Sequence, residues 1–411
     1  MHFFYVKQNV QLTLPHKQKL LIAPGSEALA QQCIPIENIY GGFIFWEYNQ
    51  AQKLIGESNA CLVDAGYIGK ELLPKKIESF CINGDIISQL QQTLRLQEAA
   101  SNRPAVRIAL VNGTGTMLGD SIVGSSILSY VGDYLASQGI DLSVDAYVAW
   151  NAKTGVEEIW KRTPYVNEVH GSSPTIAKLR HYDAYWDYSH LLHMDGYGTE
   201  QFGDFYFNHF GLDYARIDPT LKIPSLKVSQ REFELTRELI SKQTCGEPLI
   251  FVQADASTPA RSMPECFLTQ LLKLLASRWP GRIVITRRLP DGLSDQEQTK
   301  IINLLDWTKD NLDRYISAIA LSSHVVSVDT MALHVAMGCH KPGIGLFALS
   351  RPEIRLKYST QIQGILIEGA AALPYWNRHK SDEQWATVQE TYETAWMQLR
   401  LPELVESLIS S

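Results

Sequence analysis

Residues 105–139, AVRIALVNGTGTMLGDSIVGSSILSYVGDYLASQG, decide the fold of the chain. The segment begins with an apolar run, continues through a glycine-rich turn and ends in a stretch typical of a helix. A strand, a turn and a helix in this order predict a βα unit. Because the apolar run lacks the polar alternation of a strand with one exposed face, we expect a parallel sheet that is covered by helices on both faces.

The same alternation continues along the chain in two series. The first series goes on with LSVDAYVAW (142–150) and YDAYWDYS (182–189), and it stops at the polar, proline-bearing stretch RIDPTLKIPSLKVS (216–229). The second series contains expected strands separated by helices, and these strands are PLIFVQAD (248–255), RIVITR (282–287), HVVSV (324–328) and GIGLF (343–347). Two series of this kind predict an α/β protein with two Rossmann-like domains, each built on a parallel sheet.

Four parts of the chain are expected from these patterns. Residues 1–103 contain short alternating stretches broken by glycine and proline, which predict a small β-rich accessory region to which we assign no chemistry. The two α/β domains are placed at 104–225 and 226–381. Residues 382–411 carry apolar side chains at helical spacing and are expected to form C-terminal helices.

Composition and charge exclude several classes of protein. The 411 residues carry a formal net charge of −7, and lysines and arginines are scattered, so we expect no nucleic-acid partner. No apolar run approaches the about 20 residues that span a bilayer, and the N-terminus lacks the pattern of a signal peptide. We therefore expect a cytoplasmic protein. A peripheral membrane contact is left open, because an amphipathic patch is hard to detect in a sequence.

Metal-binding patterns are weak throughout the sequence. The six cysteines are widely spaced and form no CxxC pair. His190, His193 and Asp195 form a nonspecific pattern that no second cluster completes. We therefore expect neither a metal nor a bound cofactor.

The loop NGTGTMLGD (112–120) contains the candidate catalytic residue. Asp120 lies where parallel α/β sheets bind their ligands, and its carboxylate can accept a proton from a hydroxyl group. Thr116 and Gly119 belong to the same loop. Its glycine spacing fits neither GxGxxG nor a GK[ST] phosphate loop. The alternative for Asp120 is a carboxylate that caps the following helix or complements its dipole.

A second candidate site lies in VDTMALHVAMG (328–338), which follows an expected strand and opens a helix. Thr330 and the backbone amides after it, including that of Met331, can bind a diphosphate at the positive end of the helix dipole. His334 falls on the same helix face, one turn on. Asp329 would repel phosphate, and a ribose hydroxyl or backbone amides are suitable partners for it. Alternatively, Asp329 and Thr330 only cap the helix, and His334 belongs to the core.

The loop ADASTPARSMP (254–264) supplies hydroxyl groups and a permanent cation after another expected strand. Ser257, Thr258 and Arg261 can bind phosphate oxygens. The alternative is a solvated loop with an arginine on the surface.

Taken in order, these parts of the sequence resemble the family 9 glycosyltransferases, whose best-known members are the ADP-heptose:lipopolysaccharide heptosyltransferases. The matching segments are TMLGDSIVGSSIL (116–128), TPYVNEVH (163–170) with LRHYDAYWDYS (179–189), ASTPARSMPECF (256–267) and SSHVVSVDTMALHVAMGCHKPGIGLF (322–347). They resemble the family's first βα turn with its GD pair, its proline-centred element and following strand, its donor loop, and its D-T-G-x-x-H helix between two strands. The resemblance covers about residue 104 to the C-terminus, and the order of the segments makes it specific.

The resemblance implies a GT-B fold, in which two Rossmann-like domains face each other across a cleft. Residues 104–225 would hold the acceptor, and residues 226–381 would hold the nucleotide-sugar donor. The C-terminal helices, 382–411, would pack back on the acceptor-side domain.

The resemblance also implies roles for single residues. Asp120 matches the general base, Arg261 matches the donor-loop lysine, and the residues matching those that hold the nucleotide are Asp329, Thr330 and His334. The implied activity is transfer of a heptose-like sugar from an ADP-linked or other nucleotide diphosphate donor to a hydroxyl of a glycan, a lipid-linked glycan or a protein, as in lipopolysaccharide biosynthesis. The family inverts configuration without a metal.

Three residues depart from the family pattern. Met331 replaces the glycine after D-T and puts a side chain where the diphosphate would approach. Arg261 replaces a lysine, and Met263 replaces a tryptophan. Two further functions therefore stay open, a noncatalytic nucleotide- or glycan-binding subunit on the same scaffold and a nucleotide-sugar epimerase. An N-terminal extension such as 1–103 is similar to that of the autotransporter heptosyltransferases, which modify protein serines, but the chain lacks their C-terminal cysteine cluster.

Overall fold

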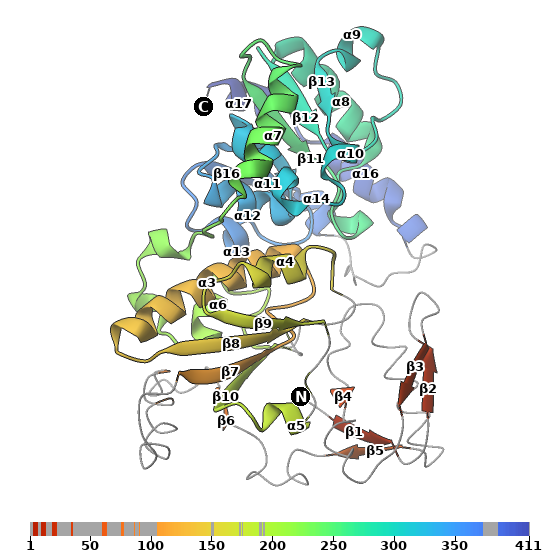
Figure 1. Ribbon diagram of the computed structural model, residues 1–411. Helices are drawn as coiled ribbons and strands as arrows, with labels where there is room; N and C mark the ends of the chain where they lie inside the picture. The colour runs from red at the N-terminus through yellow and green to blue at the C-terminus, as the bar shows by residue number, and fades with distance from the viewer. Residues whose placement is uncertain are drawn as a thin grey trace. The chain divides into compact units, whose positions relative to one another are not determined.

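The computed structural model describes most of the chain from residue 105 onward and selected segments before it. The described residues are 3–6, 10–13, 19–22, 34–35, 60–63, 75–77, 86, 90, 105–148, 152–171, 174, 176–188, 191, 194–372 and 385–410. They belong to two compact units, Met1–Ile217 and Asp218–Ser411, so the boundary precedes the one predicted between residues 225 and 226. Each unit has its own parallel sheet and its own apolar core (Figure 1).

The parallel sheet of the first unit has the strand order β6-β10-β7-β8-β9. Its strands are β6 (Lys75–Lys76), β7 (Val106–Val111), β8 (Leu142–Tyr147), β9 (Val166–His170) and β10 (Ala184–Asp187). From β7 the chain runs outward through β8 to β9, and it then returns to β10 on the other side of β7. The strand order reverses between β7 and β10, and the loops at the carboxyl ends of these strands lie where open α/β sheets bind ligands.

Part of the N-terminal region belongs to this sheet. β6 pairs with β10 in parallel register, and Ile77, Ile86 and Leu90 are buried in the same core as β7. The accessory region predicted at 1–103 thus shares a sheet and a core with the domain predicted at 104–225. The other strands described in this region pair in antiparallel fashion, β1 (Phe3–Val6) with β4 (Ile34–Pro35) and β5 (Ala60–Val63), and β2 (Val10–Thr13) with β3 (Lys19–Ile22).

Helices cover the first sheet on both faces (Figure 1). On one face lie α3 (Leu118–Ser137) and α4 (Val156–Lys161), and on the other lies α5 (Ile176–Leu179). The long helix α3 approaches the loop after β7 closely at Gly124, where a Cβ atom would lie 2.1 Å from the Thr114 hydroxyl oxygen. Further along the chain come α6 (Phe202–His209) and the 3-10 turn η6 (Tyr214–Arg216).

The sheet of the second unit is parallel throughout, with the order β13-β12-β11-β14-β15-β16. Its strands are β11 (Leu249–Gln253), β12 (Arg282–Ile285), β13 (Ile301–Asn303), β14 (His324–Val328), β15 (Gly343–Phe347) and β16 (Ile362–Leu366). Here the order reverses between β11 and β14. The carboxyl ends of these two strands therefore mark the expected ligand site of the second unit.

The helices of the second unit connect these strands. They are α7 (Gln230–Ser241), α8 (Glu265–Arg278), α9 (Asp295–Gln298), α10 (Leu305–Thr308), α11 (Leu312–Leu321), α12 (Met331–Gly338), α13 (Glu353–Leu356) and α14 (Glu368–Ala371), with 3-10 turns η7 (Pro219–Lys222) and η8 (Pro259–Arg261). Several begin at a side chain that accepts a hydrogen bond from the first turn, as Ser229 does for α7 and Asn311 for α11. Ser294 and Glu297 form a reciprocal capping box at α9.

The C-terminal segment forms α16 (Gln389–Met397) and α17 (Leu401–Ser410). Their buried side chains, among them Trp396 and Leu404, join the core of the second unit, and the Trp396 ring lies 5.1 Å from that of Phe267 in α8. The resemblance implied that these helices pack on the first domain. The contacts described for their buried side chains are with the second unit, where their apolar faces complete the core around α8.

The prediction of two α/β domains with parallel sheets is confirmed, and each strand predicted in the two series forms. The sequence does not predict β9, β13 and β16. In β9 the side chains of Asn167 and Glu168 are exposed, and β13 has only three residues, so neither has the apolar run of a buried strand. In the part of the chain that the structure describes, no helix has the length and apolar character needed to cross a bilayer.

Candidate functional site

Three neighbouring strands of the second sheet, β11, β14 and β15, end at the same edge. The loop after β11 contains η8, the loop after β14 opens α12, and the loop after β15 leads into α13. Because parallel strands end at one edge, residues far apart in the sequence meet there. We call the cluster formed by Arg261, Asp329, Ser350 and Arg355 the arginine–aspartate site.

Asp329 lies at the centre of the arginine–aspartate site. Its carboxylate lies 3.5 Å from a guanidinium nitrogen of Arg261 and 3.5 Å from one of Arg355, and it accepts a hydrogen bond of 2.8 Å from the Ser350 hydroxyl. Arg261 also donates to the backbone carbonyl of Asp329. The side chains of Asp329, Arg355 and Arg261 are 7%, 11% and 17% exposed, so the contacts are largely removed from water.

Burial and neighbouring charges fix the protonation of this cluster. Burial alone would raise the pKa of Asp329, but Arg261, Arg355 and Ser350 outweigh it and lower the pKa to about 2. Burial lowers the pKa of His334 to about 3, and Arg355 adds to this effect. At neutral pH Asp329 is therefore a carboxylate and His334 is uncharged.

The predicted residues of the β14 loop lie where the helix begins. Thr330 is the N-cap of α12, and its hydroxyl accepts a hydrogen bond of 3.2 Å from the Ala332 amide, as the capping alternative predicts. Met331 is the first residue of α12 and is half-buried. His334 is buried one turn on. Asp329 does not cap the helix with its side chain, because its carboxylate contacts the two arginines.

Of the predicted residues in the β11 loop, Arg261 contacts Asp329 directly. Arg261 closes η8, and one of its guanidinium nitrogens donates to the Ser257 hydroxyl at 3.3 Å. Thr258 contributes its carbonyl, which accepts from the Ser262 hydroxyl at 2.9 Å and so shapes the turn. Arg261 is thus not a solvated surface arginine. Its Nε atom is buried and has no hydrogen-bond partner among the described residues.

Sequence reasoning missed Ser350 and Arg355. Both lie in LSRPEIR (349–355), whose proline and mixed charges are typical of a surface turn. Only the position of this segment after a strand expected in the second sheet could have indicated them. The structure brings them to Asp329 because β15 pairs with β14.

The first unit carries the predicted base at the start of α3, just after the loop that follows β7. Asp120 lies in the first turn of α3 and is 8% exposed. The Tyr197 hydroxyl donates to its Oδ1 atom at 3.3 Å, and the Thr114 hydroxyl donates to its backbone carbonyl at 2.9 Å. The N-cap of α3 is Met117, so Asp120 is not the capping residue, although its charge complements the helix dipole.

The remainder of this loop holds Asp120 at the edge of the first sheet. The Asn112 side chain donates to the carbonyl of Tyr188, just beyond β10, at 3.1 Å. Thr116 accepts a hydrogen bond from the Lys153 amide at 2.9 Å, and Gly119 is the second residue of α3. Asp120 therefore follows β7, one of the two strands between which the order of the sheet reverses.

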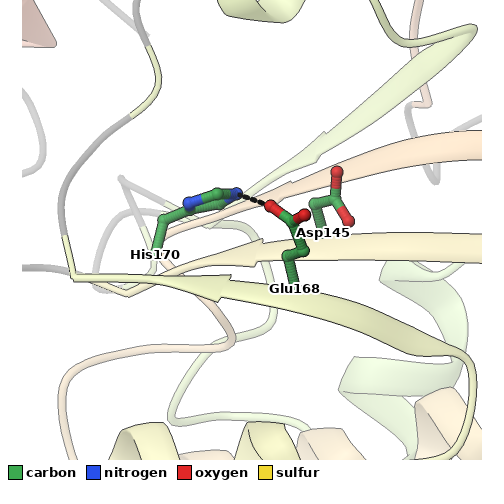
Figure 2. A group of neighbouring side chains, drawn as sticks. All are labelled: Asp145, Glu168 and His170. Carbon is green, nitrogen blue, oxygen red and sulfur yellow. Dashed lines mark ion pairs between the residues drawn. The ribbon is translucent and has the colours of Figure 1, made fainter.

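One further cluster contains residue types that bind metals. Asp145, Glu168 and His170 lie on neighbouring strands of the first sheet, with their ligand atoms within 4.8 Å of one another, and His170 Nε2 lies 3.3 Å from Glu168 (Figure 2). The carboxylate of Asp145 already accepts hydrogen bonds from Asn167, Arg107 and Tyr182. Because these donors occupy it and Arg107 brings a positive charge, the cluster is better explained as a polar network of the sheet. His190 and His193 lie outside the described residues.

Comparison with known proteins gives matches among solved structures, whereas no family model and no curated protein matches the sequence. The chain is similar to the ADP-heptose lipopolysaccharide heptosyltransferase II of E. coli, with 19% identity, a TM-score of 0.47 and coverage of 71% of this chain and 99% of that one. It is also similar to a family 9 glycosyl transferase from Veillonella parvula, with 13% identity, a TM-score of 0.46 and coverage of 73% and 99%. A third match is the iron-containing dodecameric glycosyltransferase TibC of enterotoxigenic E. coli, with 11% identity, a TM-score of 0.41 and coverage of 75% and 78%.

Proposed function

We propose that the protein is a glycosyltransferase that moves a sugar from a nucleoside diphosphate donor to an acceptor hydroxyl. The observation that carries the proposal is the convergence of Arg261 and Arg355, from two different loops, beside the start of α12 at the reversal point of the second sheet. Guanidinium groups match phosphate oxygens in geometry and charge, and a helix N-terminus favours an anion. The ligand that fits this combination is a diphosphate.

The contacts of Asp329 support this assignment. A carboxylate would repel a phosphate, but here it contacts both guanidinium groups and so holds them in fixed positions. We assign Asp329 the role of orienting Arg261 and Arg355. The buried Nε atom of Arg261, which has no hydrogen-bond partner among the described residues, is a donor that a phosphate oxygen can satisfy.

The proposed reaction is a single displacement at the anomeric carbon. The acceptor oxygen bonds to this carbon while the bond from the carbon to the diphosphate oxygen breaks and its electron pair leaves with the diphosphate. Arg261, Arg355 and the N-terminus of α12 stabilise the charge on the leaving group. Asp120, the proposed general base, takes the proton of the acceptor hydroxyl. Displacement in one step inverts the configuration at the anomeric carbon.

The finer features of the reaction follow from the resemblance in the sequence. We propose an ADP-linked, heptose-like donor and an acceptor hydroxyl on a glycan, a lipid-linked glycan or a protein, as in lipopolysaccharide biosynthesis. Two guanidinium groups can supply the positive charge that the leaving diphosphate requires, and we therefore propose transfer that is independent of a metal. We also propose that the reaction takes place in the cytoplasm.

One observation favours a second function, a noncatalytic nucleotide-binding subunit. Met331 is the first residue of α12, so its side chain stands where the resemblance implies a glycine and the close approach of a diphosphate. Such a subunit would bind a nucleotide without consuming a donor. A nucleotide-sugar epimerase would instead convert the donor without an acceptor.

The test is a donor panel followed by mass spectrometry. The purified full chain is incubated with ADP-, GDP-, UDP- and CDP-sugars, with and without a panel of glycan and peptide acceptors. A transferase releases nucleoside diphosphate and gains a glycosylated product in the presence of an acceptor. Binding of a nucleotide without donor consumption in any mixture supports the noncatalytic subunit, and isomerised donor supports the epimerase.

Arg355→Gln tests the binding site itself. We expect its affinity for ADP in calorimetry to fall at least about tenfold, because one charged contact to the diphosphate is lost. The matched control is Arg282→Gln, which removes an arginine paired with Glu247 at the start of β12, the opposite edge of the same sheet. Equal ADP affinity in the wild type and Arg355→Gln would contradict the assigned site.

A further inference from the structure

Asp120 is contacted by a residue to which nothing so far assigns a role. Tyr197 lies 77 positions further along the chain, and its hydroxyl donates to Oδ1 of Asp120 at 3.3 Å. A phenol donating to a carboxylate favours the charged form and restricts the rotation of the carboxylate.

The backbone around Tyr197 is held by a series of tight turns. The amide of Tyr197 donates to the carbonyl of Met194 at 3.1 Å, and the amide of Glu200 donates to the carbonyl of Gly196 at 2.8 Å. Gly196 has φ +86°, which glycine adopts readily, and a Cβ atom there would lie 2.6 Å from the Glu200 carboxyl carbon. The segment thus has a defined shape that depends on a glycine next to the tyrosine.

The ring of Tyr197 is held by α6. Its centroid lies 5.9 Å from that of Phe202 and 5.5 Å from that of Phe205. From the same helix, the Tyr206 hydroxyl donates to the carbonyl of Thr114 at 2.8 Å. α6 therefore supports the Asp120 loop at two points. Tyr206 binds the backbone carbonyl of Thr114, and the two phenylalanines pack against the tyrosine that binds the Asp120 carboxylate.

The second oxygen of Asp120 has a different environment. Gly115 has φ +122°, and a Cβ atom there would lie 3.2 Å from Oδ2 of Asp120. A glycine at this position keeps a side chain from crowding that oxygen.

We infer that Tyr197 is a positioning residue for Asp120: its phenol binds Oδ1 and fixes the orientation of the carboxylate that takes the proton of the acceptor hydroxyl. This inference rests on the proposed function. In the transfer step the proton moves from the acceptor hydroxyl to the carboxylate of Asp120, while the hydroxyl of Tyr197 keeps its own proton.

Other titratable groups lie on the elements around Asp120, and the test must separate them from it. In the described residues they include Asp195, Glu200, Asp204, Tyr206 and His209 on the segment of Tyr197 and α6, and Lys153, whose amide contacts the Asp120 loop. Burial, followed by the charge of Asp204, raises the pKa of Glu200. A variant Glu200→Gln therefore shows which part of a pH profile belongs to Glu200.

The test is Tyr197→Phe, which removes the hydroxyl and keeps the ring. We expect kcat to fall about tenfold, as is common for groups that orient a reacting residue. The acid limb of kcat/KM should move to higher pH, because a carboxylate that loses a hydrogen bond is protonated more readily. The matched control is Tyr165→Phe, which removes a hydroxyl that donates to the Asp133 carboxylate at 2.6 Å on another part of the same unit. It should change neither quantity.

A second measurement does not depend on activity. The carboxyl carbon of Asp120 is followed by NMR in protein labelled with 13C-aspartate, and its signal is assigned by its absence from Asp120→Asn. A higher pKa of Asp120 in Tyr197→Phe, with no change in Tyr165→Phe, supports the inference even if no donor is consumed, in which case only the proposed function fails. An unchanged pKa together with an unchanged acid limb overturns the inference.

Discussion

Asp120 and Asp329 occupy similar places in two similar units, but their neighbours differ. Each follows a strand at the reversal point of a parallel sheet, Asp329 just before the next helix and Asp120 in the first turn of that helix. Asp329 contacts two guanidinium groups and a serine hydroxyl, and its pKa is about 2. Asp120 accepts a hydrogen bond from a phenol.

In the proposed function the same fold serves two kinds of chemistry. The parallel sheet brings a carboxylate to a ligand-binding edge in both units, but the groups beside it decide its use. In the proposed reaction the carboxylate between two arginines orients them, and the carboxylate that binds a phenol takes the proton of the acceptor hydroxyl.

The largest effect is expected for Asp120→Asn. The amide cannot accept the proton of the acceptor, and kcat should fall about a thousandfold. ADP affinity in calorimetry should stay unchanged, because the proposed donor site lies in the second unit. Near-normal turnover would show that the two aspartates do not differ in the way proposed.

Asp329→Asn makes the same substitution at the corresponding aspartate of the second unit. It removes the carboxylate between Arg261 and Arg355, and breaking a largely buried ion pair from one side costs about 3 kcal/mol. The free energy of unfolding, measured with urea, should fall by this amount. Added ADP should raise the melting temperature of Asp329→Asn more than that of the wild type, because phosphate then contacts arginines that have lost their internal partner. Equal stability of the two proteins would show that Asp329 is not needed to hold the two arginines in place.

Buried His334 makes the free energy of unfolding depend on pH. Its pKa is about 3 in the folded protein and about 6.5 in an unfolded chain, so between these values only the unfolded state binds the proton. The contribution of uncharged His334 to the free energy of unfolding is therefore complete above pH 6.5. It should fall as the pH decreases, by about 2 kcal/mol between pH 6.5 and pH 5. Urea titrations across this range should show a smaller loss for His334→Gln. A loss of the same size in both proteins would assign the effect to other groups.

The sequence predicts the fold more completely than the site. Continuous apolar runs predict β7, β11, β12, β14 and β15, because strands buried on both faces need such runs. Asp120, Arg261 and Asp329 could be proposed because each follows such a strand. Arg355 and Tyr197 could not, because only tertiary packing brings the segments that carry them to the two aspartates. The packing partner of the C-terminal helices could not be predicted either, since an apolar helix face does not specify the core that it joins.

The smallest effect is expected for Met331, which separates this chain from the pattern it resembles. Met331→Gly and Met331→Ala both remove the side chain from the start of α12, and we expect ADP affinity to rise roughly threefold in each, about 0.7 kcal/mol. Alanine keeps the helix propensity that glycine lowers by up to about 1 kcal/mol, so the pair separates steric relief from a looser helix. Calorimetry measures the affinities, and thermal unfolding measures the stability. A fall in affinity in both variants would mean that the methionine contacts the nucleotide. The side chain at this position would then strengthen nucleotide binding and not hinder it.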